Sequence, residues 1–399
     1  MRLFGQIVFL IWASVNLQAQ EDWCTPGHGD IPKIKNTSLI KPRSVLTIPI
    51  VFHIVWFDNS DNISDERIQS QLDVLNTDYR KLNSDLQFVP DKFKNLSADM
   101  EIEFCLASID PNGFPTSGIT RNMTTVENIG TENTVTAPYY SKIKYTSLGG
   151  VDGWDNEKYL NVWVGKFQEN GGYLGQSTYP WKGLKSEDGI RIDPNYVGVH
   201  CINALKKKYS YGRTLTHEIG HYLGLLHPWD TSVCEIGDLV ADTPPQKEVY
   251  YGCPGEITEE ACMSIPMTMN FLEYTDDRCM AMFTKGQKAR VDSILSIYRP
   301  LLLSQNIPCN TKTKDSVLTE ANVKIYPNPT STCLVLELGI EDLKEVQLQI
   351  WDISARLIYN ETMPAIAIRP IEIGFVPKGM YIMKIISGSQ SITRKIMVI

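Results

Sequence analysis

Three histidines stand at a spacing that can hold one metal ion. His217 and His221 are four residues apart and His227 follows, and these are three of only six histidines in the 399-residue chain. On a helix, side chains four residues apart stack on one face, so two imidazoles can share an ion. Gly224 can end the helix in a left-handed turn and return His227 as a third ligand. Three nitrogen ligands leave a fourth position for water, which is typical of catalytic zinc, so we predict Zn²⁺ here.

Glu218 directly follows the first of these ligands. It is placed to take a proton from water activated by zinc and to pass it to a leaving amine. Two histidines four apart are more often part of a solvated helix face, but here a glutamate and a glycine occupy the positions that the chemistry needs. The long form of this pattern is a metalloprotease motif. The residues therefore predict a zinc-dependent hydrolase with Glu218 as its catalytic base and acid.

Composition and charge exclude several classes of protein. Apolar residues make up 43% and charged residues 21%, as in ordinary soluble domains. Lys plus Arg is 38 against 46 for Asp plus Glu, and a net charge of −8 argues against nucleic acid as a partner. Residues 1–19 combine a charged start, a short apolar run and a small-residue exit, which predicts a secretory signal peptide rather than a membrane anchor. No other segment is long and apolar enough to predict a transmembrane span in the mature protein.

The remaining chain divides into an α/β part and an all-β part. The apolar run from Val45 to Trp56 predicts a buried strand, with His53 as a core residue. Residues 64–82 predict a helix with an N-cap serine, and residues 101–107 and 159–164 predict further strands. Residues 306–321 are polar and predict a linker. From 322 to 399, short alternating segments separated by turns predict a small β-sandwich.

The histidine motif resembles that of the metzincin metallopeptidases, and three further stretches make the chain similar to the pappalysin family within that group. These stretches are residues 172–181, 237–244 and 270–280, and the similarity extends over 45–303. The resemblance implies an α+β fold: a metzincin catalytic domain over 44–305, with a mixed, mostly parallel twisted sheet and a long active-site helix, then a small all-β immunoglobulin-like sandwich. It also implies a zymogen with a pro-segment over 20–43 that matures to a zinc endopeptidase acting on proteins or peptides.

The resemblance assigns roles to three residues near the zinc ligands. Residues 270–274 take the place of the Met-turn beneath the metal, with Leu272 where the family has methionine, and the two side chains have similar volumes. Tyr274 matches a tyrosine that hydrogen-bonds the tetrahedral intermediate. Asp277 matches an acid at the bottom of the pocket for the residue just after the scissile bond, which favours Arg or Lys there. The alternative for Asp276 and Asp277 is a solvated turn.

Two glycine-containing segments have implied binding roles. Residues 171–179 resemble an upper-rim edge strand that pairs with an extended substrate, and Gly172, Leu174 and Gly175 are its candidate binding residues. From composition alone this is a glycine-rich loop. Three oxygen-bearing side chains lie in a loop that holds structural Ca²⁺ in relatives, although by composition it is only a turn. They are Asp238, Asp242 and Thr243.

Nine cysteines leave at least one thiol unpaired and are compatible with an exported protein. Four of them allow three pairings from sequence alone, and the resemblance implies Cys234 with Cys262 and Cys253 with Cys279. Cys24 resembles the family's latency cysteine, whose thiolate would occupy the fourth zinc position, and the alternative is an ordinary disulfide partner. The remaining four have no assignment: Cys105, Cys201, Cys309 and Cys333.

The tail resembles a type IX secretion sorting domain. Its marks are the segment Tyr326-Pro327-Asn328-Pro329 and the closing strand Lys395–Ile399. The resemblance implies the type IX secretion machinery of a Bacteroidetes-type bacterium as a partner, a secreted or cell-surface location, and removal of the tail on the way. Such a domain is an address read by a receptor. The alternative is a generic sandwich that binds carbohydrate or protein partners.

Three hypotheses of function follow. The first is a secreted zinc endopeptidase with a preference for Arg or Lys after the scissile bond. The second is an inactive, metal-stabilised surface adhesin, which Leu272 keeps open. The third is another metzincin family with similar chemistry, against which the 45-residue separation of His227 and Leu272 and the clustered cysteines favour the pappalysin family.

Overall fold

The computed structural model describes residues 45–131, 141–168, 173–182, 185–200, 207–230, 234, 237–255, 257, 262, 264–303, 308–310, 318–338, 345–364 and 368–399. The predicted signal peptide and pro-segment lie outside these residues, as do Cys24 and Gly172. Within the described part, no helix combines the length and the apolar character needed to cross a bilayer.

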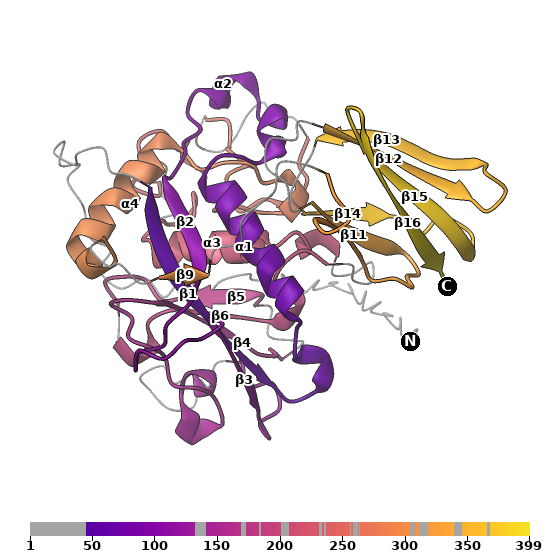
Figure 1. The fold of residues 1–399 in the computed structure, drawn as a ribbon. Helices are drawn as coiled ribbons and strands as arrows, with labels where there is room; N and C mark the ends of the chain where they lie inside the picture. Colours follow the sequence, from indigo (N-terminus) through magenta and orange to yellow (C-terminus); the bar gives the residue numbers. More distant parts are fainter. Residues whose placement is uncertain are drawn as a thin grey trace, which may run out of the picture.

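The N-terminal domain (described residues 45–310) is built on a mixed sheet of seven described strands (Figure 1). Six follow the order β5-β6-β4-β1-β2-β9, and β3 pairs with β1 off this path. The pairs of β1 with β2, β3 and β4, and of β4 with β6, are parallel, whereas β5 and β9 are antiparallel edge strands. The predicted mixed, mostly parallel sheet is confirmed. Its strands are Leu46–Trp56 (β1), Ile102–Ala107 (β2), Ile119–Met123 (β3), Leu160–Val164 (β4), Gly175–Ser177 (β5), Ile190–Ile192 (β6) and Cys309–Asn310 (β9).

Strand β1 is buried on both faces, which explains its unbroken apolar sequence. Because side chains alternate along a strand, Ile48, Ile50 and Phe52 face the main core, whereas Val51 and Val55 face smaller clusters behind the sheet. His53 shares that second face, is fully buried, and hydrogen-bonds the side chains of Thr120 and Asn161. Burial lowers its pKa to about 4, so it is a neutral core histidine, as predicted.

Four described α-helices frame the sheet: Asp65–Tyr79 (α1), Asp91–Lys94 (α2), Arg213–Tyr222 (α3) and Lys285–Tyr298 (α4). The Ser64 hydroxyl caps α1, and a capping box of Thr284 and Gln287 starts α4. Helix α3 contacts α1, the edge strand β5 and its neighbour β6, so its histidines lie near the rim of the sheet. Short 3₁₀ helices span Asn59–Asp61 (η1), Ser84–Phe88 (η2), Lys142–Lys144 (η3), Thr146–Leu148 (η4), Lys185–Glu187 (η6), Pro194–Tyr196 (η7), Lys207–Tyr209 (η8), Asp277–Cys279 (η9) and Pro300–Leu303 (η10).

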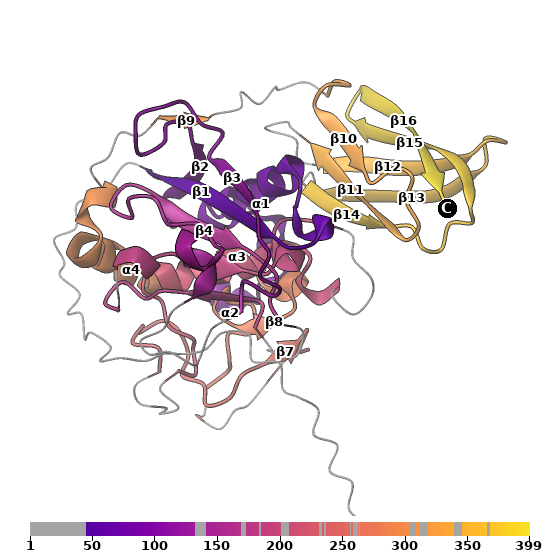
Figure 2. The ribbon, with the colours of Figure 1, turned by 90° about the horizontal axis from the view of Figure 1, so that it is seen from below.

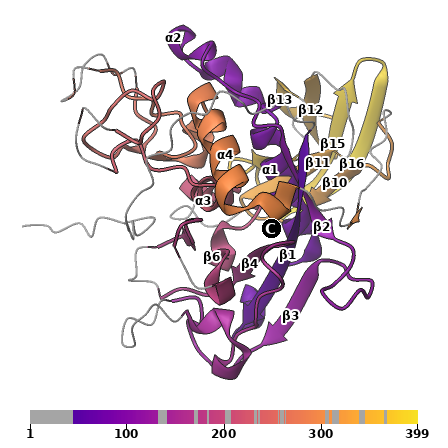
Figure 3. The ribbon, with the colours of Figure 1, turned by 90° about the vertical axis from the view of Figure 1, so that its left-hand side faces the viewer.

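Two arginines of the α4 region fix the end of α3, and Figure 3 shows the two helices side by side. Arg299 donates from Nε to the Tyr222 carbonyl at 3.3 Å, and Arg290 donates from Nε to the Gly224 carbonyl at 2.8 Å. The last carbonyls of a helix have no partner within it, and cations are favoured at that end. The two arginines therefore hold the C-terminal end of α3 against α4.

The C-terminal sandwich (described residues 318–399) consists of two antiparallel sheets, which confirms the predicted all-β part. One sheet has the order β10-β11-β14 and the other β13-β12-β15-β16. Between them lies a second apolar core that includes Leu336, Leu348 and Ile385. Figure 2 shows the sandwich beside the N-terminal domain. Its strands are Val323–Tyr326 (β10), Cys333–Leu338 (β11), Glu345–Asp352 (β12), Leu357–Pro364 (β13), Ile368–Glu372 (β14), Gly379–Ser387 (β15) and Gln390–Val398 (β16).

The predicted linker begins as part of the N-terminal domain. Its residues Cys309–Asn310 form β9, which pairs with β2, and Cys309 is disulfide-bonded to Cys105 of β2. The bond closes a sequence separation of 204 residues. Two of the unassigned cysteines therefore fasten the end of the N-terminal domain to its sheet.

Candidate active site

Helix α3 carries His217, Glu218 and His221 and ends as the motif predicts. The Gly224 amide donates to the His221 carbonyl at 2.8 Å, and Gly224 has φ +90°, in the left-handed region. A Cβ at this position would also lie 2.8 Å from the Ile294 side chain of α4. Glycine is thus required both by backbone conformation and by packing. The turn brings His227 back beside the helix.

The three imidazoles meet at a single point. The Nε2 atoms of His217, His221 and His227 lie 3.0, 3.0 and 3.1 Å from one another, and each residue is at most 1% exposed. Among the described residues this is the one group of three or more His, Cys, Asp or Glu side chains with metal-binding geometry. Nitrogens this close can all contact one ion at a Zn–N distance of about 2.0–2.1 Å.

The Nδ1 atom of each ligand is held by an oxygen. His217 Nδ1 donates to the Phe271 carbonyl at 2.8 Å, and His221 Nδ1 donates to the Leu225 carbonyl at 2.8 Å. His227 Nδ1 lies 2.7 Å from Asp230 Oδ1. Because these oxygens are acceptors, the ring protons stay on Nδ1 and three Nε2 lone pairs face each other. Three converging lone pairs repel unless a cation lies between them, so the residues fit a bound metal.

Aromatic rings close the site around these ligands. Trp229 stacks on His227 with ring centroids 4.7 Å apart, and Tyr274 meets His227 edge-on at 5.0 Å. The Tyr179 hydroxyl lies 3.1 Å from His221 Nδ1. Tyr274 is 4% exposed and its ring also lies 5.7 Å from that of His217, so it borders the group of three histidines. Such packing fixes the ring orientations.

Glu218 is 1% exposed, and this burial raises its pKa well above the usual range, opposed by the charge of Arg191. Gly175 of β5 lies against it, because a Cβ there would be 2.9 Å from Glu218 Cγ. The edge strand and the candidate base are thus in direct contact. Leu174, its neighbour, points into the core and is 5% exposed.

Leu272 forms an apolar floor beneath α3. It is fully buried, and its Cδ2 lies 3.0 Å from the position that a Cβ on Gly220 would take. The Asn270 side chain accepts the Leu272 amide at 2.9 Å, which fixes the turn, and the Phe271 carbonyl accepts His217. The buried leucine therefore packs within the turn whose Phe271 carbonyl also holds His217.

Asp277 is fully buried next to the start of α3, which differs from a solvated turn. Its Oδ2 accepts the amides of Tyr211 at 2.9 Å and Arg213 at 3.2 Å. The Arg213 guanidinium also donates to the Asp277 carbonyl at 2.7 Å. Asp277 Oδ1 has no hydrogen-bond partner among the described residues, and burial raises the pKa of the carboxyl to about 7. One buried carboxylate oxygen is thus left for a further donor.

The loop predicted to bind calcium divides into two parts. Asp238 is 1% exposed, burial raises its pKa to about 8, and neither its Oδ2 nor Thr243 Oγ1 has a hydrogen-bond partner among the described residues. Asp242 instead accepts the Thr284 hydroxyl at 2.7 Å and the Gly286 amide at 2.9 Å. Asp242 therefore caps α4, whereas Asp238 and Thr243 keep oxygens available to a cation.

The structure contains both disulfides that the resemblance implied, Cys234–Cys262 and Cys253–Cys279. Sequence reasoning missed Asp230, Trp229 and Tyr179. An acid three residues after a histidine ligand is a signal that could have revealed Asp230. Tyr179 comes from a separate segment, and no local pattern connects it with α3.

Comparisons with known proteins agree with this geometry. A peptidase family model described as pregnancy-associated plasma protein-A matches residues 150–296, and a model described as secretion system C-terminal sorting domain matches residues 324–399. An extracellular metalloprotease of Pyricularia oryzae is 29% identical over 273 residues, covering 66% of this chain and 80% of the relative.

Solved structures are similar to the N-terminal part of the chain. A structure of mirolysin with a bound compound is 37% identical with a TM-score of 0.60, and the match covers 66% of this chain and 97% of that one. A promirolysin mutant from Tannerella forsythia is 36% identical with a TM-score of 0.59, covering 65% and 84%.

Proposed function

This chain belongs to the pappalysin family of metalloendopeptidases and ends in a type IX sorting domain, and from that premise we propose that it is exported as a zymogen and cleaves proteins before Arg or Lys. The observation that carries the proposal is the convergence of three buried Nε2 atoms beside Glu218. The sorting domain and the extracellular relatives support secretion or a cell-surface location. The adhesin alternative is not favoured, because Leu272 is fully buried in a turn held by Asn270 and the relatives include extracellular metalloproteases.

The chemistry divides between the metal and the chain. His217, His221 and His227 would hold a zinc ion, which would supply a Lewis acid for the scissile carbonyl and lower the pKa of water to about 7. Glu218 takes the proton from the attacking water and transfers it to the leaving amine. The Tyr274 hydroxyl donates a hydrogen bond to the oxyanion as the tetrahedral carbon forms.

Substrate is held along β5, together with the adjoining residues Gly172 and Leu174. Among the described strands, β5 is the last in the sheet order and pairs on one side only, with β6. An extended peptide can add to that edge antiparallel through main-chain hydrogen bonds. Since Gly175 contacts Glu218, a peptide on this edge passes the candidate base.

Asp277 determines the preference for a basic residue after the scissile bond. Its free, buried Oδ1 can accept a charge-assisted hydrogen bond from Arg or Lys. We expect Asp277→Asn to lower kcat/KM for such peptides about 10- to 100-fold, since hydrogen bonds to charged groups contribute about 1.5–3 kcal/mol. Digestion of a peptide library by the activated enzyme measures this. Asp276→Asn is the matched control, and an unchanged basic preference in Asp277→Asn would disprove the assignment.

Latency would depend on the pro-segment, whose Cys24 thiolate would serve as a further ligand of a bound metal. A promirolysin structure among the similar proteins supports a proform. Cleavage before Lys41 or Arg43 fits the proposed pocket, so maturation can be self-catalysed. Purified Glu218→Ala zymogen should then keep its pro-segment during incubation, whereas Cys24→Ser should mature faster. Normal maturation of the Glu218→Ala protein would exclude self-cleavage.

Calcium stabilises the Asp238 loop through Asp238 Oδ2 and Thr243 Oγ1, for which the described residues offer no well-formed hydrogen bond. Ligand binding to the folded state adds about 2.7 kcal/mol when the free ion is at 100 times Kd. Added Ca²⁺ should therefore raise Tm of the unmodified chain and have a smaller effect on Asp238→Asn. The same Tm response to Ca²⁺ in both proteins would argue against this site.

A further inference from the structure

The C-terminal sandwich contacts the N-terminal domain through its three-stranded sheet (Figure 2). Val335 of β11 packs with Val199, and Val74 of α1 and Tyr326 of β10 border the pair. Val335 and Val199 are 1% and 2% exposed. We call these four residues the docking contact. Its centre is closed to water, as in the core of a specific interface.

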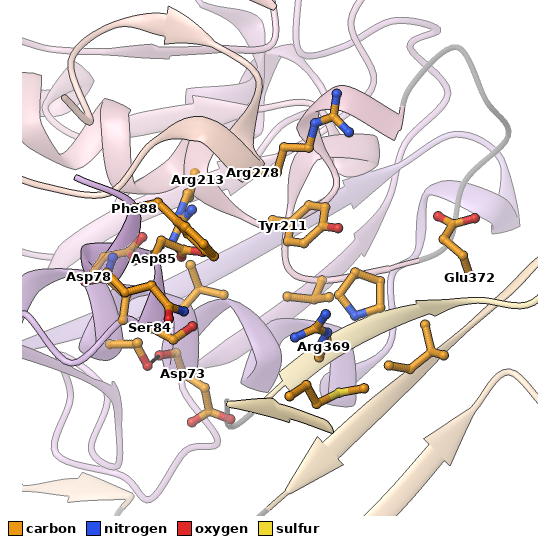
Figure 4. Close-up of a pocket in the computed structure, with 18 of the residues that line it drawn as sticks. Asp73, Asp78, Ser84, Asp85, Phe88, Tyr211, Arg213, Arg278, Arg369 and Glu372 are labelled. Atoms are coloured by element: carbon orange, nitrogen blue, oxygen red, sulfur yellow. Dashed lines mark hydrogen bonds and ion pairs between the residues drawn. The ribbon is translucent and has the colours of Figure 1, made fainter. Parts of the chain in front are cut away.

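Charged side chains surround the docking contact. The pKa of Glu66 in α1 is lowered by hydrogen bonds from its own backbone and from Ser64, and the charge of Lys324 across the interface adds to this effect. Next to the docking contact lies a cavity of about 480 Å³ between the two domains, and Val74 and Val199 belong to its lining. Figure 4 shows Arg369 and Glu372 of β14 on one side of this cavity, facing Tyr211 and Arg278 of the N-terminal domain.

The docking contact reaches the wall of the proposed specificity pocket. Val199 forms an antiparallel bridge with Tyr211, and the Tyr211 amide donates to Asp277 Oδ2. Three steps therefore connect Val335 of the sandwich with the Asp277 carboxylate. If the sandwich stays with the enzyme, Val335 keeps its contact with Val199, which pairs with Tyr211 of this wall.

The cysteines show how the sandwich can be retained. Cys333 of β11 is disulfide-bonded, whereas the other six described cysteines pair among themselves. Of the nine cysteines in the chain, only Cys24 and Cys201 remain as partners, and both lie outside the described residues. Both also precede the sandwich by more than a hundred residues in sequence. Either pairing therefore crosses from the sandwich to the part of the chain before the linker.

We propose that the disulfide at Cys333 joins the C-terminal sandwich to the preceding chain, so that a cut in the linker leaves the sandwich attached to the enzyme. The three other disulfides have both partners at or before residue 309, so none of them spans a cut within 311–317. Release then needs two events, hydrolysis of the linker and reduction of one disulfide. Reduction by dithiothreitol supplies two electrons and two protons, which give two thiols and leave the reductant as a cyclic disulfide.

The test uses the full chain with Glu218→Ala, to prevent self-cleavage, and a recognition sequence for a highly specific protease in place of residues 311–317. After cutting, denaturing electrophoresis without reductant should show one band at the mass of the uncut chain, and two fragments after reduction. Denaturation removes the docking contact, so only a covalent bond can hold the fragments together. Two fragments without reductant would overturn the proposal.

Two variants serve as controls. Cys333→Ser should give two fragments under both conditions, and its fragments staying together without reductant would also overturn the proposal. The double variant Cys105→Ser and Cys309→Ser removes a disulfide that does not span the cut, so its fragments should remain joined. The comparison of the chain with and without reductant needs no cysteine variant, so it stands even if a variant fails to fold.

Mass mapping of the linked peptides identifies the partner of Cys333 and separates this inference from the proposed function. A bond to Cys201 supports the tether and leaves Cys24 free for latency. A bond to Cys24 would tie the sandwich to the pro-segment, so it supports the tether only in the zymogen, and it rules out the latency role. The Glu218→Ala variant is inactive and is cut by an added protease. The identity of the partner of Cys333 therefore does not depend on whether the chain is a peptidase.

Discussion

The interior of the N-terminal domain is polar around the three histidines, whereas the interior of the C-terminal sandwich is apolar. The side chains of Asp230, Asp277 and Glu218 are buried near the three histidines. The described part of the sandwich buries only two polar side chains, those of Thr330 and Glu337. Burying a polar group costs free energy unless it is paired. The difference teaches that the N-terminal domain gives up stability to hold a reactive arrangement, and the sandwich does not.

The largest expected effect is on hydrolysis. We expect Glu218→Gln to lower kcat about 10²–10⁴-fold, which is the usual contribution of a general base, with metal content unchanged. Glu345→Gln changes an exposed glutamate of the sandwich and should leave kcat as it is. Peptide hydrolysis and zinc content are measured on both. If kcat falls less than tenfold in Glu218→Gln, Glu218 is not the general base, and much of the contrast between the two domains is lost.

A smaller effect is expected on metal affinity. Asp230 holds His227 Nδ1, and the loss of such a partner weakens metal binding about 10- to 100-fold. Asp230→Asn should therefore release zinc at a lower chelator concentration. Asp352→Asn removes an acid that accepts backbone amides in a turn of the sandwich, so it provides the matched control. Equal zinc retention in the two variants would show that Asp230 does not support the ligand.

The preference for a basic residue should change about tenfold with pH. Burial raises the pKa of the Asp277 carboxyl to about 7, so its negative charge is lost as pH falls through that value. The ratio of cleavage before Arg to cleavage before Leu should drop about tenfold between about pH 8 and pH 6, and not in Asp277→Asn. A ratio cancels pH effects on the metal site, so a flat ratio in the unmodified enzyme would contradict this assignment.

The raised pKa of Asp277 also makes the free energy of unfolding depend on pH. Because the folded state binds this proton more tightly than the unfolded state, stability due to the protonated form is present at low pH. It is lost as pH rises through about 7. No residue of the sandwich has an equivalent role in the proposed chemistry.

The smallest effect is expected for Leu272→Met. Since the swap conserves volume, the free energy of unfolding should change by less than about 1.5 kcal/mol, and hydrolysis should stay near that of the unmodified enzyme. Leu348→Met in the sandwich core is the matched control, and urea unfolding measures both. A much larger loss of activity than of stability in Leu272→Met would show that leucine has a specific role at this turn.

The parts that local sequence patterns predicted are those with strong periodicity. The buried strand at β1, the helix after Ser64 and the histidine helix all follow from spacing and capping within the segment itself. Strand β9 was not predictable in this way, since its two residues pair with β2 and bond to Cys105 across a sequence separation of 204 residues. Arg213 was also missed, because its partners Asp78 and Asp277 lie 135 and 64 residues away.

Two of the acceptors that orient the imidazoles, the Leu225 carbonyl and Asp230, lie within four residues of their histidines, whereas the Phe271 carbonyl lies 54 residues from His217. An unfolded polypeptide contains all three histidines but lacks the Met-turn that holds the His217 ring toward the other two. Tight capture of zinc should therefore begin only once the Met-turn has closed under α3. Before it folds, the chain would then lack bound zinc and could not hydrolyse other proteins, with or without its pro-segment.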